Sequence, residues 1–95
     1  MESWRFVFTI IGQKDLDSLD PPVRKRVSEK LLWFRENFSA VIPFPLGGPL
    51  SGFFKLRVGE WRVVYEIDQK KMEIIVHVID LRDRIYKRAR KLIRR

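Results

Sequence analysis

Three cationic side chains lie close together in residues 53–67, on two segments with the composition of neighbouring strands. Lys55 and Arg57 alternate in the first segment, and Arg62 is the second residue of the next. Cleavage of a phosphodiester by the 2′-hydroxyl of RNA needs a base for the hydroxyl proton, positive charge at the phosphorane and an acid for the leaving oxygen. Lysine and arginine provide that charge without a metal ion. The alternative is that these cations only form a solvated face of the sheet.

A second group of cations lies at the C-terminus. Residues 1–81 hold 12 Lys or Arg and 11 Asp or Glu, a net charge of +1, whereas residues 82–95 hold 8 Lys or Arg and one Asp, a net charge of +7. Positive charge of this density attracts phosphate, an acidic protein or an anionic membrane surface. Charge alone leaves all three partners open.

Tyr86 and His77 are the uncharged candidates for chemistry near these cations. Tyr86 either packs in the core or stacks on a base, and its basic neighbours favour the second setting. His77 is either a hydrogen-bonded sheet residue or a group that transfers protons near neutral pH. The residues expected to bind RNA around the reacting groups are Arg57, His77, Arg84, Lys87 and Arg88.

The chain contains no cysteine and one histidine, which limits metal chemistry. The usual zinc ligands are therefore missing, and we expect neither a metal ion nor a small-molecule cofactor. The apolar runs are short and interrupted by charge, and residues 1–10 lack the pattern of a secretory signal. We therefore expect a cytoplasmic protein that does not enter the membrane. The length of 95 residues predicts a single domain over residues 1–95.

The N-terminal half predicts one strand and two helices. Apolar residues alternate from Trp4 through Phe6 and Phe8 to Ile10, which is the period of a strand with one buried face. A short helical segment with Leu16 and Leu19 follows. The second helix begins after residue 20, because an aspartate cap precedes proline in the first turn. Its buried stripe is expected to be Val23, Val27, Leu31, Phe34 and Phe38.

Residues 39–52 hold three prolines and three glycines and predict a long loop without regular structure. Two β-rich runs follow, and the Gly59-Glu60 pair between them favours a two-residue hairpin with a type II′ turn. This turn sets the register of the hairpin, which pairs Val58 with Trp61, Leu56 with Val63 and Phe54 with Tyr65 on an apolar face. The opposite face carries Arg57 directly across from Arg62, a like-charge pair that suggests an anionic counterpart.

A turn at residues 68–71 leads into another strand over residues 73–81. If Ile67 faces Met72, His77 lies opposite Arg62, and the core side receives Ile74, Val76 and Val78. Residues 80–95 predict a basic helix with an apolar face of Ile85, Ala89, Leu92 and Ile93. The chain thus predicts an α+β fold, with a small antiparallel sheet of about four strands. Two N-terminal helices pack on one face, and the order is strand, helix, helix, three strands and a basic C-terminal helix.

The segment Gly52–Ile67, GFFKLRVGEWRVVYEI, resembles the RelE/ParE toxins of type II toxin–antitoxin systems. The segment Asp80–Tyr86, DLRDRIY, is similar to the ending of the same family, in which an arginine precedes a tyrosine. The resemblance covers nearly the whole chain. It does not separate RelE members, which cut mRNA in the ribosomal A site, from ParE members, which poison DNA gyrase.

The resemblance implies a role for four residues. Lys55 matches a lysine that acts as general base or contacts the phosphate, and Arg62 matches an arginine that stabilises the transition state. Arg82 matches a proposed general acid, and Tyr86 matches the aromatic residue that stacks on the mRNA base. The resemblance further implies a cognate antitoxin protein, the ribosome and mRNA as partners.

Two positions depart from the RelE pattern. A second lysine that lies two residues before the first in many members is Phe53 here, and a histidine that precedes the arginine is Leu81. Three hypotheses follow: a metal-independent, ribosome-dependent mRNA endonuclease, a ParE-like gyrase inhibitor, and an RNA-binding member that does not cleave. The four residues with matched roles occur together, which favours the nuclease.

Overall fold

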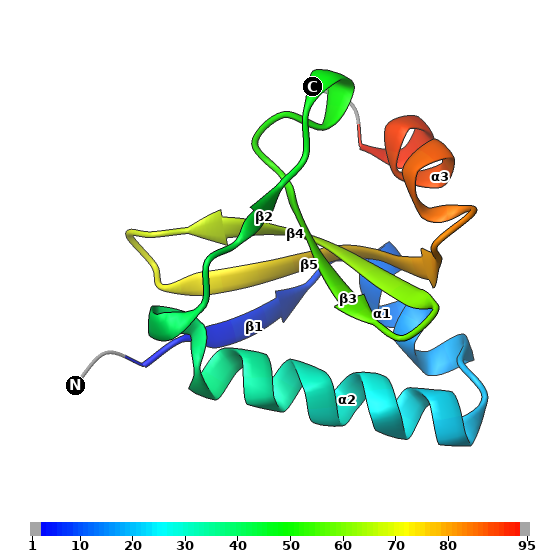
Figure 1. Cartoon of the computed structure of the whole chain (residues 1–95), viewed down its shortest axis with the longest axis horizontal. Helices are drawn as coiled ribbons and strands as arrows, with labels where there is room; N and C mark the ends of the chain where they lie inside the picture. Colours follow the sequence, from blue (N-terminus) through cyan, green and yellow to red (C-terminus); the bar gives the residue numbers. More distant parts are fainter. Residues whose placement is uncertain (1–2, 94–95) are drawn as a thin grey trace.

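The fold combines a five-stranded sheet with three α-helices over residues 3–93, the part of the chain that the computed structural model describes (Figure 1). The strands are β1 (Arg5–Phe8), β2 (Phe44–Pro45), β3 (Phe54–Val58), β4 (Trp61–Asp68) and β5 (Glu73–Leu81). The helices are α1 (Ile10–Ser18), α2 (Pro21–Glu36) and α3 (Ile85–Leu92). Short 3-10 turns lie at Phe38–Ala40 and Gly48–Leu50.

The strand order in the sheet is β1-β5-β4-β3-β2. The predicted α+β class, with its order of elements and basic C-terminal helix, is confirmed. The sheet differs from the prediction in two details: β2 adds a fifth strand, and β1 runs parallel to β5, so the sheet is mixed. Alternation in the sequence reports which side chains share a face, but it says nothing about strand direction.

The first strand is shorter than predicted. It ends at Phe8, and Thr9 caps α1 by accepting a hydrogen bond from the backbone N–H of Gly12 at 3.0 Å. Ile10, predicted to face the core, is 78% exposed at the start of α1. Gly12 packs so tightly on β5 that a Cβ atom there would lie 2.4 Å from the Val76 carbonyl oxygen, so α1 requires glycine at this point.

Helix α2 begins at Pro21 and covers one face of the sheet, as predicted. Its stripe of Val27, Leu31 and Phe34 is buried against the sheet, and Phe38 is buried in the turn that follows. Leu19, at the end of α1, joins the same cluster. Burial of these side chains supplies most of the apolar stabilisation on this face.

The β3–β4 hairpin has the predicted register, and its turn contains Gly59 with φ +58°. That conformation is natural for glycine at the first position of a type II′ turn. The observed pairs are Val58 with Trp61, Leu56 with Val63, Phe54 with Tyr65, and Arg57 with Arg62.

The β4–β5 pair differs from the prediction in two ways: Ile67 pairs with Ile74 and not with Met72, and a β-bulge shifts the register between Val64 and Tyr65. Tyr65 pairs with Val76 and Val64 pairs with Val78, so His77 is the extra residue. The prediction that Val78 faces the same core as Ile74 and Val76 is wrong. Val78 instead packs on the opposite face of the sheet.

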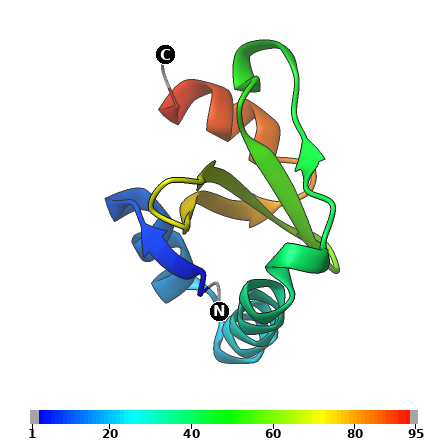
Figure 2. The same cartoon turned by 90° about the vertical axis from the view of Figure 1, so that its left-hand side faces the viewer.

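Helix α3 covers that opposite face, so the sheet lies between α2 and α3 (Figure 2). Ile85 and Ala89 are fully buried there, as predicted for the apolar side of this helix, whereas Leu92 is 41% exposed. The predicted helix covered residues 80–95, but residues 80 and 81 belong to β5 and α3 begins at Ile85. Residues 94 and 95 lie outside the described part of the chain. The second apolar cluster contains Leu50, Phe53, Val64, Val78, Ile85 and Ala89.

Residues 39–52 are more ordered than predicted. Phe44 and Pro45 form β2 and pair with Lys55 and Phe54 at the outer edge of β3. The Leu46 N–H also donates to the Phe53 carbonyl oxygen at 2.9 Å. The prolines and glycines of this segment therefore shape a path along the sheet edge.

Candidate functional site

Lys55 lies at the centre of the candidate site, on β3 opposite Val64. Its Nζ lies 4.1 Å from the ring centroid of Phe44 and 5.7 Å from that of Tyr86. Phe44 belongs to β2 and Tyr86 to the first turn of α3, so three elements meet at this ammonium group. Cation–π attraction of about 0.5–1 kcal/mol for each exposed ring favours this arrangement.

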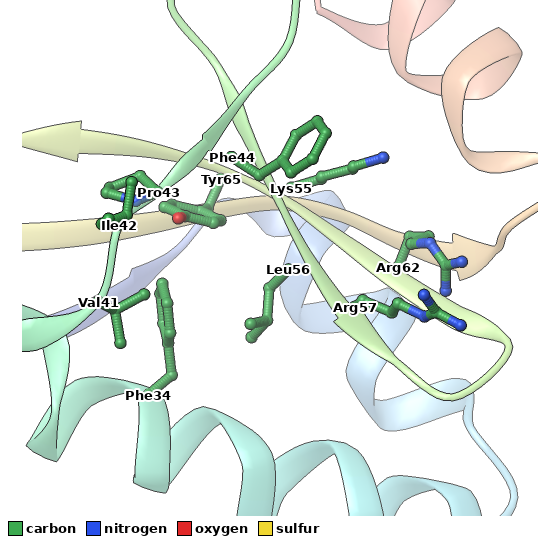
Figure 3. A pocket seen from close by; sticks show the side chains of 10 residues that line it. All are labelled: Phe34, Val41, Ile42, Pro43, Phe44, Lys55, Leu56, Arg57, Arg62 and Tyr65. Carbon is green, nitrogen blue, oxygen red and sulfur yellow. The ribbon is translucent and has the colours of Figure 1, made fainter.

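Arg57 and Arg62 lie at the hairpin end of the site, and Figure 3 shows their side chains near the turn. Arg57 is exposed. Arg62 is 9% exposed, and its Nη1 donates to the carbonyl oxygens of Gly59 at 2.7 Å and Trp61 at 2.9 Å. The two carbonyl groups thus bind the Arg62 guanidinium beside Arg57, and Asp80 of β5 pairs with Arg62 in the sheet.

Arg82 is attached to the same turn. Its backbone N–H donates to the Glu60 carbonyl oxygen at 2.9 Å, and its Nε lies 2.9 Å from the Glu60 Oε2. Both side chains of this ion pair are mostly exposed, so the pair contributes no more than about 1 kcal/mol. An anionic ligand can therefore replace Glu60 as the partner of Arg82 at low cost.

Tyr86 is half-buried. Part of its side chain packs against the apolar cluster under α3, and its ring approaches Lys55. The adjacent Ile85 is fully buried and fixes the start of the helix. The geometry thus brings Tyr86, Lys55, Arg57 and Arg62 to one face of the sheet, with Arg82 at the adjoining turn.

His77 lies elsewhere, and its predicted position opposite Arg62 is wrong. Ile67 pairs with Ile74 and not with Met72, and the bulge adds one more residue, so Asp80 lies opposite Arg62. The His77 Nε2 lies 3.0 Å from the Glu66 Oε1, and the imidazole is edge-on to Phe53 with centroids 5.1 Å apart. Glu66 is four residues beyond Arg62 along β4, which is roughly 13 Å of strand. His77 is therefore a hydrogen-bonded sheet residue that does not face Arg62.

Arg88, predicted to bind RNA, lies in an ion-pair network. Its Nη2 and Nη1 donate to the two carboxylate oxygens of Asp15 at 2.6 and 2.8 Å, and Asp80 lies 3.4 Å away. Asp15 is buried and also accepts the backbone N–H of Ile79 at 2.9 Å. The hydrogen bonds to Asp15 raise the pKa of the Arg88 guanidinium, although burial opposes them. This network joins α1, β5 and α3.

The two other predicted RNA-binding residues, Arg84 and Lys87, are exposed at the start of α3. The sequence reading missed Phe44 and Asp15. Pro43 and Pro45 on either side of Phe44 indicate a constrained backbone, but prolines are equally typical of loops. No sequence signal connects Asp15 to Arg88, because they are 73 residues apart.

A pocket of about 320 Å³ adjoins the site at the outer edge of β3 (Figure 3). Tyr65 lies at its base, and the buried hydroxyl of this residue has no hydrogen-bond partner among the described residues. Burial raises the pKa of Tyr65. The lining consists of Phe34, Val41, Ile42, Pro43, Phe44, Lys55, Leu56, Arg57, Arg62 and Tyr65.

Within residues 3–93, no cluster of three or more His, Cys, Asp or Glu side chains is arranged to hold a metal ion. None of the described helices is long and apolar enough to cross a membrane.

Three comparisons relate the chain to known proteins. Residues 12–91 match the family model of the ParE toxin of the type II toxin–antitoxin system parDE. Toxin RelG of Mycobacterium tuberculosis is 30% identical over 81 residues, which cover 85% of this chain and 93% of RelG.

Solved structures give the same result. A chain of the RelBE2 toxin–antitoxin complex from M. tuberculosis superposes with a TM-score of 0.74 and 27% identity, over 85% of this chain and all of that chain. The isolated Escherichia coli RelE toxin superposes with a TM-score of 0.70 and 22% identity, over 94% of this chain and 97% of that chain, which shows the shared fold.

Proposed function

The chain belongs to the RelE/ParE superfamily of type II toxins, and we propose that it is a ribosome-dependent mRNA endonuclease that cuts in the A site. The observation that carries the proposal is the position of Lys55 between two aromatic rings, beside a hairpin turn that holds Arg62 and Arg82. Aromatic surface for bases and clustered positive charge for phosphate are the two requirements of a site that binds single-stranded RNA.

The proposed reaction is transfer of the phosphodiester to the neighbouring 2′-oxygen. The 2′-oxygen bonds to phosphorus, the bond to the 5′-oxygen breaks, and the products are a 2′,3′-cyclic phosphate and a 5′-hydroxyl. Lys55, as a neutral amine, takes the 2′-hydroxyl proton and becomes an ammonium group beside the phosphate, and Arg82 donates a proton to the leaving oxygen. Arg62 offsets the charge on the phosphorane, and Tyr86 stacks on a base to orient the attack.

The rigidity of Arg62 supports its role in that reaction. Its guanidinium is anchored to two backbone carbonyl groups, so little side-chain entropy is lost when a phosphate binds. Arg82 differs from Arg62, because its ion pair with Glu60 is exposed and a phosphate can replace Glu60 in it. The site has no histidine among its cations, so it depends more on alignment of the mRNA than on a strong acid or base. The ribosome would supply that alignment.

The proposed protein partner is a cognate antitoxin. The RelBE2 structure is a toxin–antitoxin complex, and this chain has the surface that such a partner would neutralise. Residues 82–95 carry seven net positive charges, and the part of the chain described shows no acidic partner for Lys55 or Arg57. An acidic segment of the antitoxin fits both regions.

A ParE-like gyrase inhibitor is the second candidate, and the match to the ParE toxin family model favours it. A gyrase inhibitor does not need a phosphate-binding cluster between aromatic rings, which is why we rank it second. The third hypothesis, RNA binding without cleavage, follows from Phe53 and Leu81 at positions where RelE toxins carry a lysine and a histidine.

The test is a cell-free translation reaction with the purified protein, in which mRNA 5′ ends are mapped by primer extension. Cuts within translated codons that disappear without ribosomes would support the nuclease. Intact mRNA with DNA cleaved by stalled gyrase would support the second candidate, and RNA binding with neither product would support the third.

Variants of the site make the test specific. Arg62→Ala is expected to lower the cleavage rate about 100- to 1,000-fold, because one charge-stabilising donor is lost. Lys70→Ala is the matched control, since Lys70 is an exposed cation in the distant β4–β5 turn. Circular dichroism reports whether Arg62→Ala remains folded, and equal rates for the two variants would exclude Arg62 from the site.

A further inference from the structure

Phe44 is unusual among the aromatic residues of this site because the residue is 59% exposed. A single exposed apolar side chain is ordinary on a protein surface. Phe44, however, lies on the same side of β3 as Lys55, and its ring directly contacts the ammonium group (Figure 3). The exposed ring is therefore part of the charged site.

The backbone around Phe44 is held in place. Pro43 and Pro45 flank it and restrict their own backbone φ angles. Phe44 pairs with Lys55 in the sheet, and a hydrogen bond of 2.9 Å from Leu46 N–H to the Phe53 carbonyl oxygen continues the contact with the edge of β3. A ring fixed in this way loses little entropy when a ligand stacks on it.

The arrangement is two aromatic rings with one cation between them. The Lys55 Nζ lies within 4.1 Å of the Phe44 centroid and 5.7 Å of the Tyr86 centroid. If two consecutive nucleotides each stack on one ring, the phosphodiester that joins them lies near the ammonium. This order of base, phosphate and base matches the order of ring, cation and ring.

We propose that Phe44 is a second stacking platform, which binds the base of the nucleotide next to the one stacked on Tyr86. The inference rests on the proposed function, because it names a further contact of the same RNA strand. Single-stranded RNA fits better than an apolar peptide, because the exposed ring contacts Lys55, which lies beside the phosphate in the proposed reaction, and Arg57 lines the same pocket. Phe44 thereby contributes to which codon position is cut.

The experiment measures kcat/KM for cleavage on programmed ribosomes with wild type, Phe44→Leu and Phe44→Trp. Loss of one stacked base is expected to lower kcat/KM of Phe44→Leu by about 5- to 150-fold, and Phe44→Trp is expected to retain activity. Ile10→Ala is the control, because Ile10 is a 78% exposed apolar residue at the start of α1 that does not line the site. It is expected to stay within about twofold of wild type, as is usual for exposed positions.

An abasic nucleotide separates stacking from an indirect role through Lys55. If Phe44 stacks on a base, removal of the base at the neighbouring position lowers cleavage by wild type but does not further lower cleavage by Phe44→Leu. If Phe44→Leu instead lowers cleavage of the intact and the abasic mRNA by the same factor, Phe44 only packs against Lys55, and the proposal is overturned. Unchanged cleavage with weaker antitoxin binding would also overturn it and assign the ring to the antitoxin.

A second readout does not require cleavage, so the failure of the proposed function remains distinguishable. A short single-stranded RNA containing 5-iodouridine is irradiated with the protein, and crosslinked peptides are identified by mass spectrometry. A crosslink at Phe44 supports the platform even if wild type does not cut mRNA. Crosslinks at Tyr86 without any at Phe44 would overturn it.

Discussion

The two faces of the sheet are built in different ways. The face under α2 is apolar along its length and is covered by a helix of 16 residues. The face under α3 is apolar only around Val64 and Val78, beneath a helix of 8 residues. Around that small cluster lie Lys55, Arg57 and Arg62. Stability is thus concentrated on the first face, and charged chemistry on the second.

The attachment of the helices differs accordingly. Helix α2 is held by buried aromatic and aliphatic side chains, and Phe34 makes edge-on contacts with Phe38 and Tyr65 at 5.1 and 5.2 Å. Helix α3 buries only Ile85 and Ala89 and gains the ion pair of Arg88. The position of Tyr86 therefore depends on a polar contact as well as on apolar packing, whereas the opposite face depends on packing alone.

The largest expected effect is on the α2 face. Phe34→Ala should lower the free energy of unfolding by about 3–5 kcal/mol, because it opens a cavity beside the rings of Phe38 and Tyr65. Chemical denaturation at neutral pH measures the change. Leu32→Ala, at a half-exposed position on the outer side of α2, is the control and should cost about 0.5 kcal/mol. Similar losses for both variants would contradict the description of this face.

A smaller effect is expected where Arg88 holds α3. Arg88→Gln removes both hydrogen bonds to Asp15 and leaves a buried carboxylate with its bond from Ile79 alone. Breaking a fully buried pair costs about 3–5 kcal/mol, and the partial exposure of Arg88 reduces the expected loss to about 2 kcal/mol. Amide hydrogen exchange should accelerate in α3 more than in α2.

Lys87→Gln provides the matched control for that measurement, because it removes the same charge from an exposed position of the same helix. It should leave exchange in α3 nearly unchanged. If Lys87→Gln and Arg88→Gln accelerate exchange equally, the effect is one of net charge, and the contact with Asp15 does not hold the helix.

The sequence predicted the α2 face better than the α3 face, for physical reasons. The stripe of α2 and the register of the hairpin follow from spacing within one segment, and Gly59 fixes the turn. The bulge beside His77 depends on how two strands pack against helices on both sides, which no local pattern encodes. The same holds for Asp15 and Arg88, which meet only after the sheet has formed.

The site was predicted in part. The charges on the hairpin could be placed from alternation, so Lys55, Arg57 and Arg62 lie on the expected face. Val64 alternates onto the same face as these charges and is fully buried. An apolar residue at this position indicates that part of the charged face is covered by another element, which is α3. The short pairing of Phe44 with Lys55 is also a tertiary contact, and nothing in the composition of residues 39–52 separates it from a loop.

The smallest effect is expected at Tyr65, where the apolar face contains a polar atom. The buried hydroxyl has no partner within residues 3–93, so Tyr65→Phe should leave the stability at pH 7 unchanged or raise it by up to about 1 kcal/mol. Burial raises the pKa of this tyrosine above its ordinary value. The folded protein therefore keeps the proton at a pH where the unfolded chain releases it.

The sign of the pH dependence follows from that difference. The contribution of Tyr65 to stability is fully present below the unfolded pKa of about 10 and declines as the pH rises, by up to about 1.4 kcal/mol for each pH unit. Urea unfolding of wild type and Tyr65→Phe at pH 7, 9 and 10.5 should show a smaller decline in the variant. Tyr86→Phe removes the other phenol and shows whether the decline belongs to Tyr65. Equal declines in wild type and Tyr65→Phe would mean that the hydroxyl is not isolated in the core, and that the α2 face is less purely apolar than its packing indicates.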